Sequence, residues 1–392
     1  MQELNNILNY IKAQTLVIPD KPAIIVQEGS AITYADLYQR MCDRATLPIP
    51  LLGDSWDSDF YLKTTGTTGK SKTVIISQQA VIANSQNLIH AHGYSSDTVF
   101  IVAGALDHLG GWSKIFPTLM VGGTLIILDG IKDVNAFFRA LDYDSAHLAT
   151  FLVPASIRML LQFSADKLAS YSDKIEFIET GAAPISHSDM LRLCQLLPRT
   201  RLFNTYASTE TGIVCSYNFN DGRTKAGCCG KPLPASQVFI TESGTIACKG
   251  KTLMSAYLGE PEMTAIVLKD QCIYTADSGY IDDEGMLHVL GRNDDIINIG
   301  GYKVDPVEVE NRALAYDGIE DCICIADDHP VLGNIVKLLV KTNNDKPFDK
   351  KQLAWFIAQT LDQYKVPTRY ERVATINRTS NGKLDRKSYR NK

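Results

Sequence analysis

The sequence is organised around one stretch rich in threonine, serine and glycine, Leu62-Lys63-Thr64-Thr65-Gly66-Thr67-Thr68-Gly69-Lys70-Ser71-Lys72-Thr73-Val74-Ile75-Ile76-Ser77. Glycine lets a backbone turn with positive φ and approach a ligand closely. Successive backbone N–H groups and hydroxyls can then surround an anion, and a lysine adds positive charge. The composition favours a loop that binds polyphosphate. A flexible Ser/Thr/Gly loop on the surface is the alternative.

A Walker A loop is the nearest mechanistic rival, and it needs G-x-x-x-x-G-K-[ST] followed by a helix. Gly69, Lys70 and Ser71 match the end of that pattern, but Thr64 stands where its leading glycine belongs. Residues 73–77 are β-branched and apolar, which predicts a strand. The stretch therefore differs from a Walker A loop in two features, the missing leading glycine and the strand that is predicted to follow.

The totals describe an ordinary globular protein. With 392 residues the chain is long enough for two or three domains, and its net charge of −5 is mild. No Lys/Arg-rich run is present, so we expect no nucleic-acid partner. The nine cysteines form no C-x-x-C, which favours reduced thiols over structural zinc. No run approaches the ~20 apolar residues of a membrane span, so we expect a cytoplasmic protein.

Strands and helices alternate through the first half of the chain. We expect helices over 1–16, 34–44, 78–92, 134–141 and 154–163, and strands over 23–26, 31–34, 73–77, 98–102, 122–128, 148–153 and 175–178. Residues 104–112 read as a turn. This order is typical of βαβ units in a largely parallel sheet. From about residue 222 short strands indicate a β-rich subdomain, and a compact α+β module follows a boundary at 291–295.

Four further stretches carry polar residues in distinctive patterns. They are Asn204-Thr-Tyr-Ala-Ser-Thr-Glu-Thr-Gly212, Tyr274-Thr-Ala-Asp-Ser-Gly-Tyr280, Gly291-Arg-Asn-Asp-Asp-Ile-Ile-Asn-Ile-Gly-Gly-Tyr-Lys-Val304 and Asn377-Arg-Thr-Ser-Asn-Gly-Lys-Leu-Asp-Arg386. By residue type alone, Thr209 and Glu210 could belong to a turn, Asp277 to a β-turn and Lys383 to a basic tail.

Together and in this order, the five stretches resemble the acyl-adenylate-forming family. That family includes acyl-CoA synthetases, firefly luciferase and peptide-synthetase adenylation domains. Its motifs read roughly [ST]-[ST]-G-T-T-G-x-x-K-x-V, Y-G-x-T-E, Y-x-T-G-D, G-R-x-D-D-x-I-K-x-x-G and P-R-x-x-x-G-K-[LIV]-x-R. The chain departs from them at Ala276 (usually Gly), Asn298 (usually Lys) and Asn377 (usually Pro).

The resemblance implies a nucleotide site. ATP or AMP would be bound by Thr64, Thr65, Gly66, Thr67, Thr68, Gly69, Lys72, Gly181, Ala182, Ala183, Asn204, Thr205, Tyr206, Asp277 and Arg292. In it Tyr206 would stack on adenine and Asp277 would accept from both ribose hydroxyls. Glu210 would hold Mg²⁺, which prefers oxygen ligands.

The resemblance also assigns catalytic, acyl and thiol-binding residues. The catalytic group would be Lys383, Thr209, Glu210 and His108, with Lys383 stabilising the charge that builds up on the α-phosphate. The acyl pocket would be lined by His108, Gly110, Gly111, Trp112 and Ala207. A lone histidine such as His108 is also often structural. Gly300, Gly301 and Lys303 would line a tunnel for the thiol of coenzyme A.

The implied fold is α/β with two domains. A large N-terminal domain, residues 1–293, would contain an abbreviated opening (1–46) and the β-rich part (about 222–291). A small mobile α+β domain, 294–392, would turn about a hinge at Asp294. Family members place a longer run of strands and helices before the phosphate loop, so part of one N-terminal subdomain is missing here.

The implied activity is that of a ligase with two half-reactions. ATP would activate a carboxylic acid to acyl-AMP with release of pyrophosphate, and coenzyme A would then accept the acyl group as a thioester. The acid could be aryl, o-succinylbenzoate-like or a medium acyl group. One alternative is a stand-alone adenylation enzyme that loads a separate carrier protein. Another is a catalytically inactive, nucleotide-binding regulatory protein.

Overall fold

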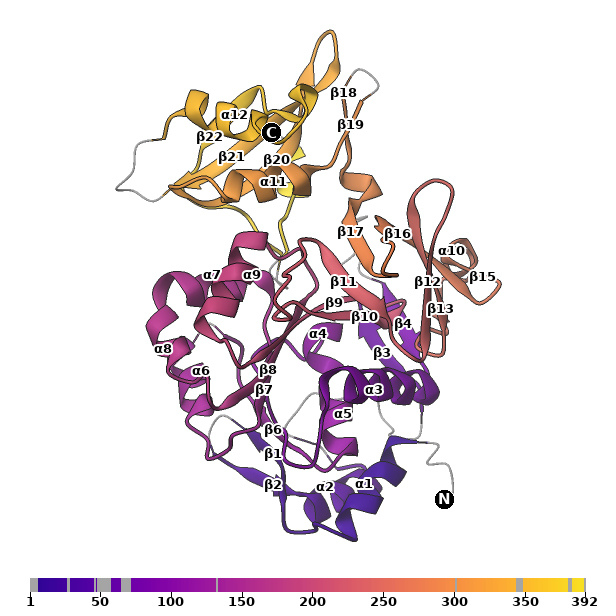
Figure 1. Ribbon diagram of the computed structural model, residues 1–392. Helices are drawn as coiled ribbons and strands as arrows, with labels where there is room; N and C mark the ends of the chain where they lie inside the picture. The colour runs from indigo at the N-terminus through magenta and orange to yellow at the C-terminus, as the bar shows by residue number, and fades with distance from the viewer. Residues whose placement is uncertain are drawn as a thin grey trace.

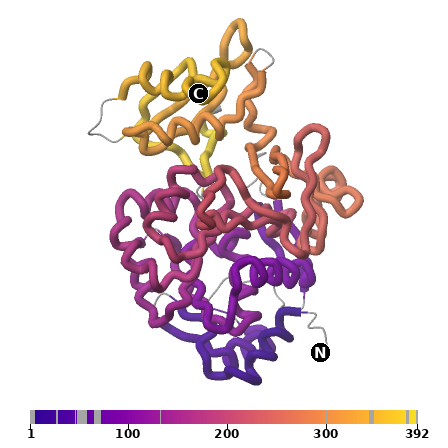
Figure 2. Tube along the Cα trace, in the orientation of Figure 1, coloured from indigo at the N-terminus to yellow at the C-terminus, as the bar shows by residue number. Residues whose placement is uncertain are grey.

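A computed structural model of the chain describes residues 6–26, 29–45, 47, 58–64, 72–131, 133–299, 302–342, 348–379 and 383–390. These residues form a large body, which is the described part of 6–292, and a C-terminal unit, which is the described part of 297–390 (Figure 1). The unit lies at one end of the body. A segment near the C-terminus reaches from the unit back to the body in Figures 1 and 2.

The helices of the large body are α1 (Ile7–Thr15), α2 (Tyr34–Cys42), α3 (Gln78–His92), α4 (Leu109–Trp112), α5 (Ile115–Met120), α6 (Val134–Leu141), α7 (Pro154–Phe163), α8 (Ala165–Ala169), α9 (His187–Leu196) and α10 (Pro261–Val267). Its strands are β1 (Pro22–Val26), β2 (Ala31–Thr33), β3 (Phe60–Lys63), β4 (Thr73–Ile76), β5 (Val99–Val102), β6 (Thr124–Ile127), β7 (Leu148–Phe151), β8 (Ile175–Gly181), β9 (Arg201–Ser208), β10 (Gly212–Asn218), β11 (Cys228–Pro232), β12 (Ser236–Ile240), β13 (Thr245–Gly250), β14 (Ala256–Tyr257), β15 (Leu268–Lys269), β16 (Cys272–Ile281) and β17 (Leu287–Arg292).

One long mixed sheet organises the large body. Its strand order is β12-β13-β16-β17-β11-β10-β9-β8-β7-β5-β6-β1-β2, with β15 paired to β16. From β1 through β6, β5, β7 and β8 to β9 all neighbours are parallel. Beyond β9 the pairs are antiparallel, and the strands of the β-rich part continue the same sheet through β10 and β11. The expected α/β fold with a parallel-rich sheet is confirmed.

The parallel strands are apolar throughout because helices cover both faces of the sheet. In β5, Phe100 and Val102 enter the core that includes side chains of α1, α2, α3 and α5. The alternate residues, Val99 and Ile101, enter the core formed with α6, α7, α8 and α9. The sequence pattern of β5 therefore reflects burial on two sides.

Local signals start and stop the helices near the expected residues. The Ser77 side chain accepts from the Ala80 N–H at the start of α3, and Gly93 ends this helix with φ +68°. Pro154 occupies the first turn of α7. Both helices have the bounds that the sequence predicted.

Several elements differ from the sequence-based expectation: the helices α5, α8, α9 and α10 were not predicted, and neither were α4 and β3. Residues 109–112, expected as part of a turn, form the short helix α4. A Cβ on Gly111 would lie 2.7 Å from the Ala105 carbonyl oxygen, so glycine permits this close packing. Strand β3 was not predicted from the sequence. It alternates buried Phe60 and Leu62 with exposed residues and pairs with β4.

The C-terminal unit has its own small core. It contains the hairpin β18 (Ile297–Ile299) and β19 (Tyr302–Val304), the sheet β20 (Ile319–His329), β21 (Gly333–Thr342) and β22 (Arg369–Arg372), and the helices α11 (Pro306–Leu314), α12 (Lys350–Ala358) and α13 (Lys387–Arg390), with the 3₁₀ turns η1 (Asn293–Asp295) before it and η2 (Gln363–Lys365) within it. Apolar residues of α11, α12, β20 and β21 pack together. Among the described residues no helix is long and apolar enough to cross a membrane.

Candidate active site

The ends of the predicted phosphate loop are joined at the base of the β3–β4 hairpin. The Thr64 N–H donates to the Lys72 carbonyl oxygen at 2.8 Å. The Lys72 N–H donates to Thr64 Oγ1 at 3.3 Å. The predicted residues Thr65, Gly66, Thr67, Thr68 and Gly69 lie outside the described part of the chain. A strand follows the loop, as expected, and a Walker A loop is thereby excluded.

Lys72, Tyr257 and Glu210 form a short chain of contacts. The Lys72 ammonium lies 4.8 Å from the centre of the Tyr257 ring. The Tyr257 hydroxyl donates to Glu210 Oε1 at 2.7 Å. Burial and the Glu210 carboxylate both raise the pKa of Tyr257, so its hydroxyl keeps the proton that it donates. The sequence motifs did not identify Tyr257, because it lies far along the chain from Glu210.

Thr209 and Glu210 sit at the turn between β9 and β10. Ser208 and Thr211 close this turn by mutual hydrogen bonds, with Oγ to Oγ1 at 3.0 Å. Gly212 has φ +67°, and a Cβ there would lie 2.4 Å from Asn84 Oδ1. The turn therefore has one tightly packed conformation, and Glu210 projects from it toward Tyr257.

Asp277 and Arg292 are direct neighbours on the antiparallel strands β16 and β17. The Tyr206 hydroxyl donates to Asp277 Oδ2 at 2.8 Å. Burial and the Asp277 charge raise the pKa of Tyr206, so it donates at all ordinary pH values. The Tyr206 ring is only 6% exposed, packed with residues such as Cys248. This hydroxyl–carboxylate contact was not predicted.

The ends of β8 and β9 approach each other closely. Gly181 pairs with Thr205, and a Cβ on Gly181 would lie 2.8 Å from the Thr205 carbonyl oxygen. Ala182 has φ +65°, which is rare for a residue with a side chain. The buried Thr205 hydroxyl has no hydrogen-bond partner among the described residues. The Asn204 amide donates to the Cys228 carbonyl oxygen at 2.7 Å, so it holds β11 in place.

Lys383 comes from the C-terminal unit and enters the same site. Burial lowers the pKa of its ammonium, while Asp277 raises that pKa, Arg292 lowers it and Glu210 raises it. The loop that carries it is closed by a 2.8 Å hydrogen bond from the Thr379 N–H to the Lys383 carbonyl oxygen. The charges of residues from three distant motifs therefore act on one lysine.

The predicted acyl-pocket residues lie around α4. His108 precedes this helix, with a side chain 21% exposed and Nδ1 3.8 Å from Asp107 Oδ1. A Cβ on Gly110 would lie 2.6 Å from the Phe151 ring. Trp112 packs edge-on against Phe116 with ring centres 4.8 Å apart, which is a core position. Ala207 lies near the end of β9 and is partly buried.

A buried ion pair near α4 was not anticipated from the sequence. Lys114 Nζ lies 2.6 Å from Glu179 Oε1, and their side chains are 0% and 1% exposed. His92 Nδ1 lies 3.5 Å from the other carboxylate oxygen. Lys114 is also 5.2 Å from the centre of the Phe151 ring that packs on Gly110. The sequence signal for this ion pair was the charged residue Glu179 within a buried strand, because a fully buried charge is almost always paired.

The remaining predicted residues lie in separate segments of the chain. Asp294 lies in η1, where its carboxylate is 3.9 Å from Arg292 Nη2. Lys303 is exposed on β19, opposite Asn298. Ala183 follows Ala182 in the turn after β8 and is partly buried. Gly300 and Gly301 lie outside the described residues.

The donor set at this site fits Mg²⁺ bound together with a nucleotide. The described residues contain no group of three or more His, Cys, Asp or Glu that could hold a metal ion. Glu210 is a single carboxylate, and Mg²⁺ is commonly held by one or two carboxylates plus the phosphates of a substrate. The residues present therefore suit an ion that arrives with ATP.

The fold and the site together, a parallel-rich α/β body whose polar residues act on a lysine of a small C-terminal unit, are typical of enzymes that bind nucleotides. Residues 54–258 match the family model described as AMP-binding enzyme, and residues 308–383 match the AMP-binding enzyme C-terminal domain. The first match covers more than half of the chain. The chain therefore belongs to the AMP-binding enzyme family.

Curated relatives at 26–29% identity are named as CoA ligases. The indoleacetate–CoA ligase of Aromatoleum aromaticum is 28% identical over 82% of this chain and 64% of its own length. The feruloyl-CoA synthase of Amycolatopsis sp is 29% identical over 84% of this chain and 68% of its own. The 2-succinylbenzoate–CoA ligase of Listeria monocytogenes is 26% identical over 93% and 76%. The chain thus spans 64–76% of the length of these relatives.

Solved structures support the fold. The o-succinylbenzoate CoA synthetase MenE from Bacillus subtilis, bound to its acyl-adenylate, superposes with a TM-score of 0.83 at 18% identity, covering 98% of each chain. ATP-bound MatB from Rhodopseudomonas palustris gives a TM-score of 0.78 at 24% identity, covering 93% of this chain and 74% of its own.

Proposed function

We propose that this chain is an AMP-forming acid–coenzyme A ligase. ATP activates a carboxylic acid to acyl-AMP, and coenzyme A then takes the acyl group as a thioester. The observation that carries the proposal is the polar cluster of Tyr206, Asp277 and Arg292 on β9, β16 and β17, whose charges act on Lys383 of the C-terminal unit. Membership of the AMP-binding enzyme family and the naming of its relatives as CoA ligases support the same reaction.

The nucleotide would be held at both ends. At one end Asp277 accepts from the ribose hydroxyls, with its carboxylate oriented by Tyr206. At the other end Lys72 and residues 64–69 hold the β- and γ-phosphates. Thr209 donates to the α-phosphate between them. Gly181, Ala182 and Ala183 border the adenine, where a bulkier residue at 181 would meet the β9 backbone.

Glu210 would bind Mg²⁺ that accompanies the phosphates. Tyr257 would orient the Glu210 carboxylate, because its hydroxyl donates a hydrogen bond to one of the two carboxylate oxygens. The ion, when bound, neutralises charge on the phosphates during phosphoryl-group chemistry. Removal of the Tyr257 side chain would therefore keep Glu210 as a metal ligand but leave its carboxylate less firmly oriented.

In the first half-reaction an oxygen of the substrate carboxylate attacks the α-phosphorus, and the bond to pyrophosphate breaks. Lys383 bridges the attacking carboxylate and the α-phosphate, and stabilises the negative charge that develops on the α-phosphate. A preorganised cation at this point typically contributes ~10²–10³ in rate. His108 and the residues around α4 hold the acyl group.

In the second half-reaction the C-terminal domain, residues 294–392, turns about Asp294 relative to residues 1–293. The thiol of coenzyme A then attacks the acyl carbonyl carbon and displaces AMP. Gly300 and Gly301 would line the path of the thiol, and Lys303 would attract a phosphate of coenzyme A. Domain rotation of this kind separates two chemistries that share one site.

The acid is an aryl, an o-succinylbenzoate-like or a medium acyl carboxylate, and the protein acts in the cytoplasm. The test is ATP–pyrophosphate exchange with a panel of benzoate, ferulate, o-succinylbenzoate and octanoate. Strong exchange with one acid supports adenylation and identifies the class. No exchange with any of these acids, despite measurable ATP binding, would favour the inactive regulatory protein.

A stand-alone adenylation enzyme that loads a carrier protein is the second candidate. Both candidates give exchange, and they differ in the acceptor. Release of AMP that saturates with coenzyme A supports the ligase. Release that saturates only with a holo carrier protein supports the alternative.

A further inference from the structure

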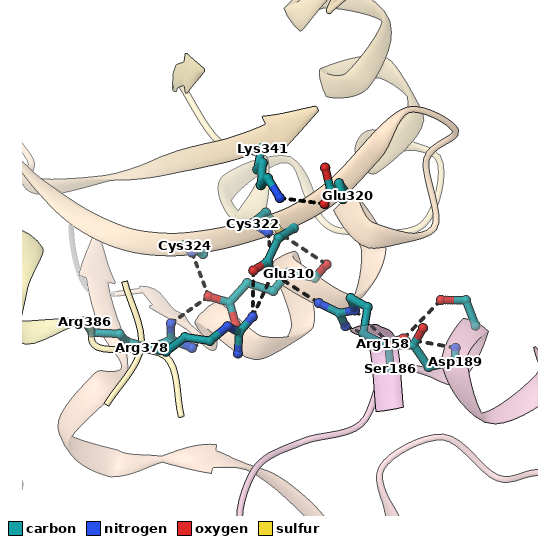
Figure 3. A network of polar contacts seen from close by, with 12 residues as sticks. Arg158, Ser186, Asp189, Glu310, Glu320, Cys322, Cys324, Lys341, Arg378 and Arg386 are labelled. Atoms are coloured by element: carbon teal, nitrogen blue, oxygen red, sulfur yellow. Dashed lines mark hydrogen bonds and ion pairs between the residues drawn. The ribbon is translucent and has the colours of Figure 1, made fainter. Parts of the chain in front are cut away.

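One arginine of the large body connects it to the C-terminal unit. Arg158 on α7 donates from Nε and Nη2 to Asp189 Oδ2 at 3.1 and 2.9 Å. Its remaining Nη1 donates to Asp321 Oδ1 on β20 at 3.1 Å (Figure 3). The side chains of Arg158 and Asp321 are only 16% and 17% exposed. Asp189 therefore holds the guanidinium in an orientation in which Nη1 can donate to the unit.

Asp321 also holds the loop that carries Lys383. Arg378 Nη2 donates to Asp321 Oδ1 and Oδ2 at 2.9 and 2.7 Å. Arg378 forms an isolated β-bridge with Leu384, directly after Lys383. One carboxylate thus contacts the large body through Arg158 and the base of the lysine loop through Arg378.

The other side of the loop is anchored within the unit. Arg386 donates to Glu310 on α11 at 2.6 and 2.8 Å, and both side chains are buried. Arg386 Nε also lies 3.6 Å from Asp295 Oδ2. These contacts would persist if the unit turned as a rigid piece, whereas the Arg158–Asp321 contact would break.

We propose that Arg158 and Asp321 are positioning residues for the adenylation step. Their ion pair docks the C-terminal unit so that Lys383 lies in the site, and it opens before thioester formation. The inference rests on the proposed two-step function. Loss of the ion pair shifts the population of the unit away from the docked arrangement. Neither residue of the pair would touch a substrate.

Arg158→Ala tests this because Asp321 keeps Arg378 as a partner in the variant. With the panel acid that gives the fastest exchange in the unsubstituted chain, exchange should fall about 10-fold, because the docked arrangement loses one partly buried ion pair. Coenzyme A thioester formation from chemically prepared acyl-AMP should be unchanged or faster. Arg158→Lys should recover part of the exchange. Arg139→Ala, which removes an exposed ion pair with Asp133, is the matched control and should change neither rate.

A second variant separates positioning from folding. Asp321→Asn should likewise reduce pyrophosphate exchange and spare thioester formation. In the double variant with Arg158→Ala, exchange should fall by less than the product of the two single effects, because both substitutions remove the same ion pair. Equal loss in both half-reactions, or unchanged exchange in Arg158→Ala, would overturn the inference. Absence of exchange in the unsubstituted chain would instead contradict the proposed function.

Discussion

The Tyr206 hydroxyl lies 2.8 Å from Asp277 Oδ2 and joins β9 to β16 across the candidate nucleotide site. Asp277→Ala should weaken ATP binding by ~1–3 kcal/mol, because a charged acceptor for the ribose is lost. Tyr206→Phe should weaken it by about 1 kcal/mol or less, because the carboxylate stays but is no longer oriented. Isothermal calorimetry with ATP measures both. An unaltered Kd in Asp277→Ala would remove Asp277 from the ribose site.

Lys383→Ala should abolish acyl-AMP formation and spare thioester formation from supplied acyl-AMP. The expected loss is ~10²–10³ in the exchange rate, because a cation that stabilises the transition state is removed. Lys365→Ala is a suitable control, since this lysine also lies in the C-terminal unit and pairs with Glu308. Exchange that survives in Lys383→Ala would refute the assignment.

Asp294→Pro should give the opposite pattern. Proline fixes φ near −65°, so rotation about this residue would be hindered. We expect thioester formation to fall more than pyrophosphate exchange, with the two followed separately at matched protein concentration. A parallel fall in both rates would indicate a folding defect or a hinge elsewhere.

Lys303→Glu should raise the KM for coenzyme A and leave pyrophosphate exchange nearly intact. Charge reversal repels the phosphates of coenzyme A, and Lys303 is exposed on β19. The measurement is AMP release against coenzyme A concentration. Lys269→Glu, an exposed lysine on β15, provides the charge-matched control. A KM equal to that of the unsubstituted chain would exclude Lys303 from the acceptor site.

Asp305 should make stability depend on pH. Burial raises the pKa of its carboxyl from 3.8 to about 7, despite the N–H of Val307 that it accepts as the N-cap of α11. Between these pKa values the native state holds a proton that the unfolded state has lost. The free energy of unfolding therefore decreases as pH rises from about 4 to about 7.

Asp305→Asn keeps an N-cap but removes this titration. The free energy of unfolding of Asp305→Asn should rise relative to that of the unsubstituted chain between about pH 4 and about pH 7, as measured by urea unfolding. Asp349→Asn, at the exposed N-cap of α12, is the control. Identical pH profiles for Asp305→Asn and the unsubstituted chain would contradict the prediction.

Local patterns made much of the fold predictable. Apolar runs such as β5 and capped segments such as α3 carry their signals within a few residues. α4 was missed because its two glycines indicate a turn by propensity, while packing against Ala105 makes the helix possible. The continuous sheet from β10 into β11 is a long-range pairing that no local pattern specifies.

The sequence predicted only those site residues that lie within recognisable motifs. Lys383, Asp277 and Glu210 lie in recognisable stretches, and the structure brings them together. Tyr257 and Arg158 lie in stretches without a motif, and their roles come from partners 47 and 163 residues away. Such contacts depend on the folded topology, so sequence spacing could not identify them.

The most direct test of the central claim is the identity of the nucleotide product. The purified chain would be incubated with ATP, Mg²⁺, coenzyme A and the panel acid that supports exchange, and the products separated by chromatography. The account predicts AMP, pyrophosphate and acyl-coenzyme A in equal amounts, each dependent on both the acid and coenzyme A. Formation of ADP and phosphate, or AMP without any acyl-coenzyme A, would contradict it.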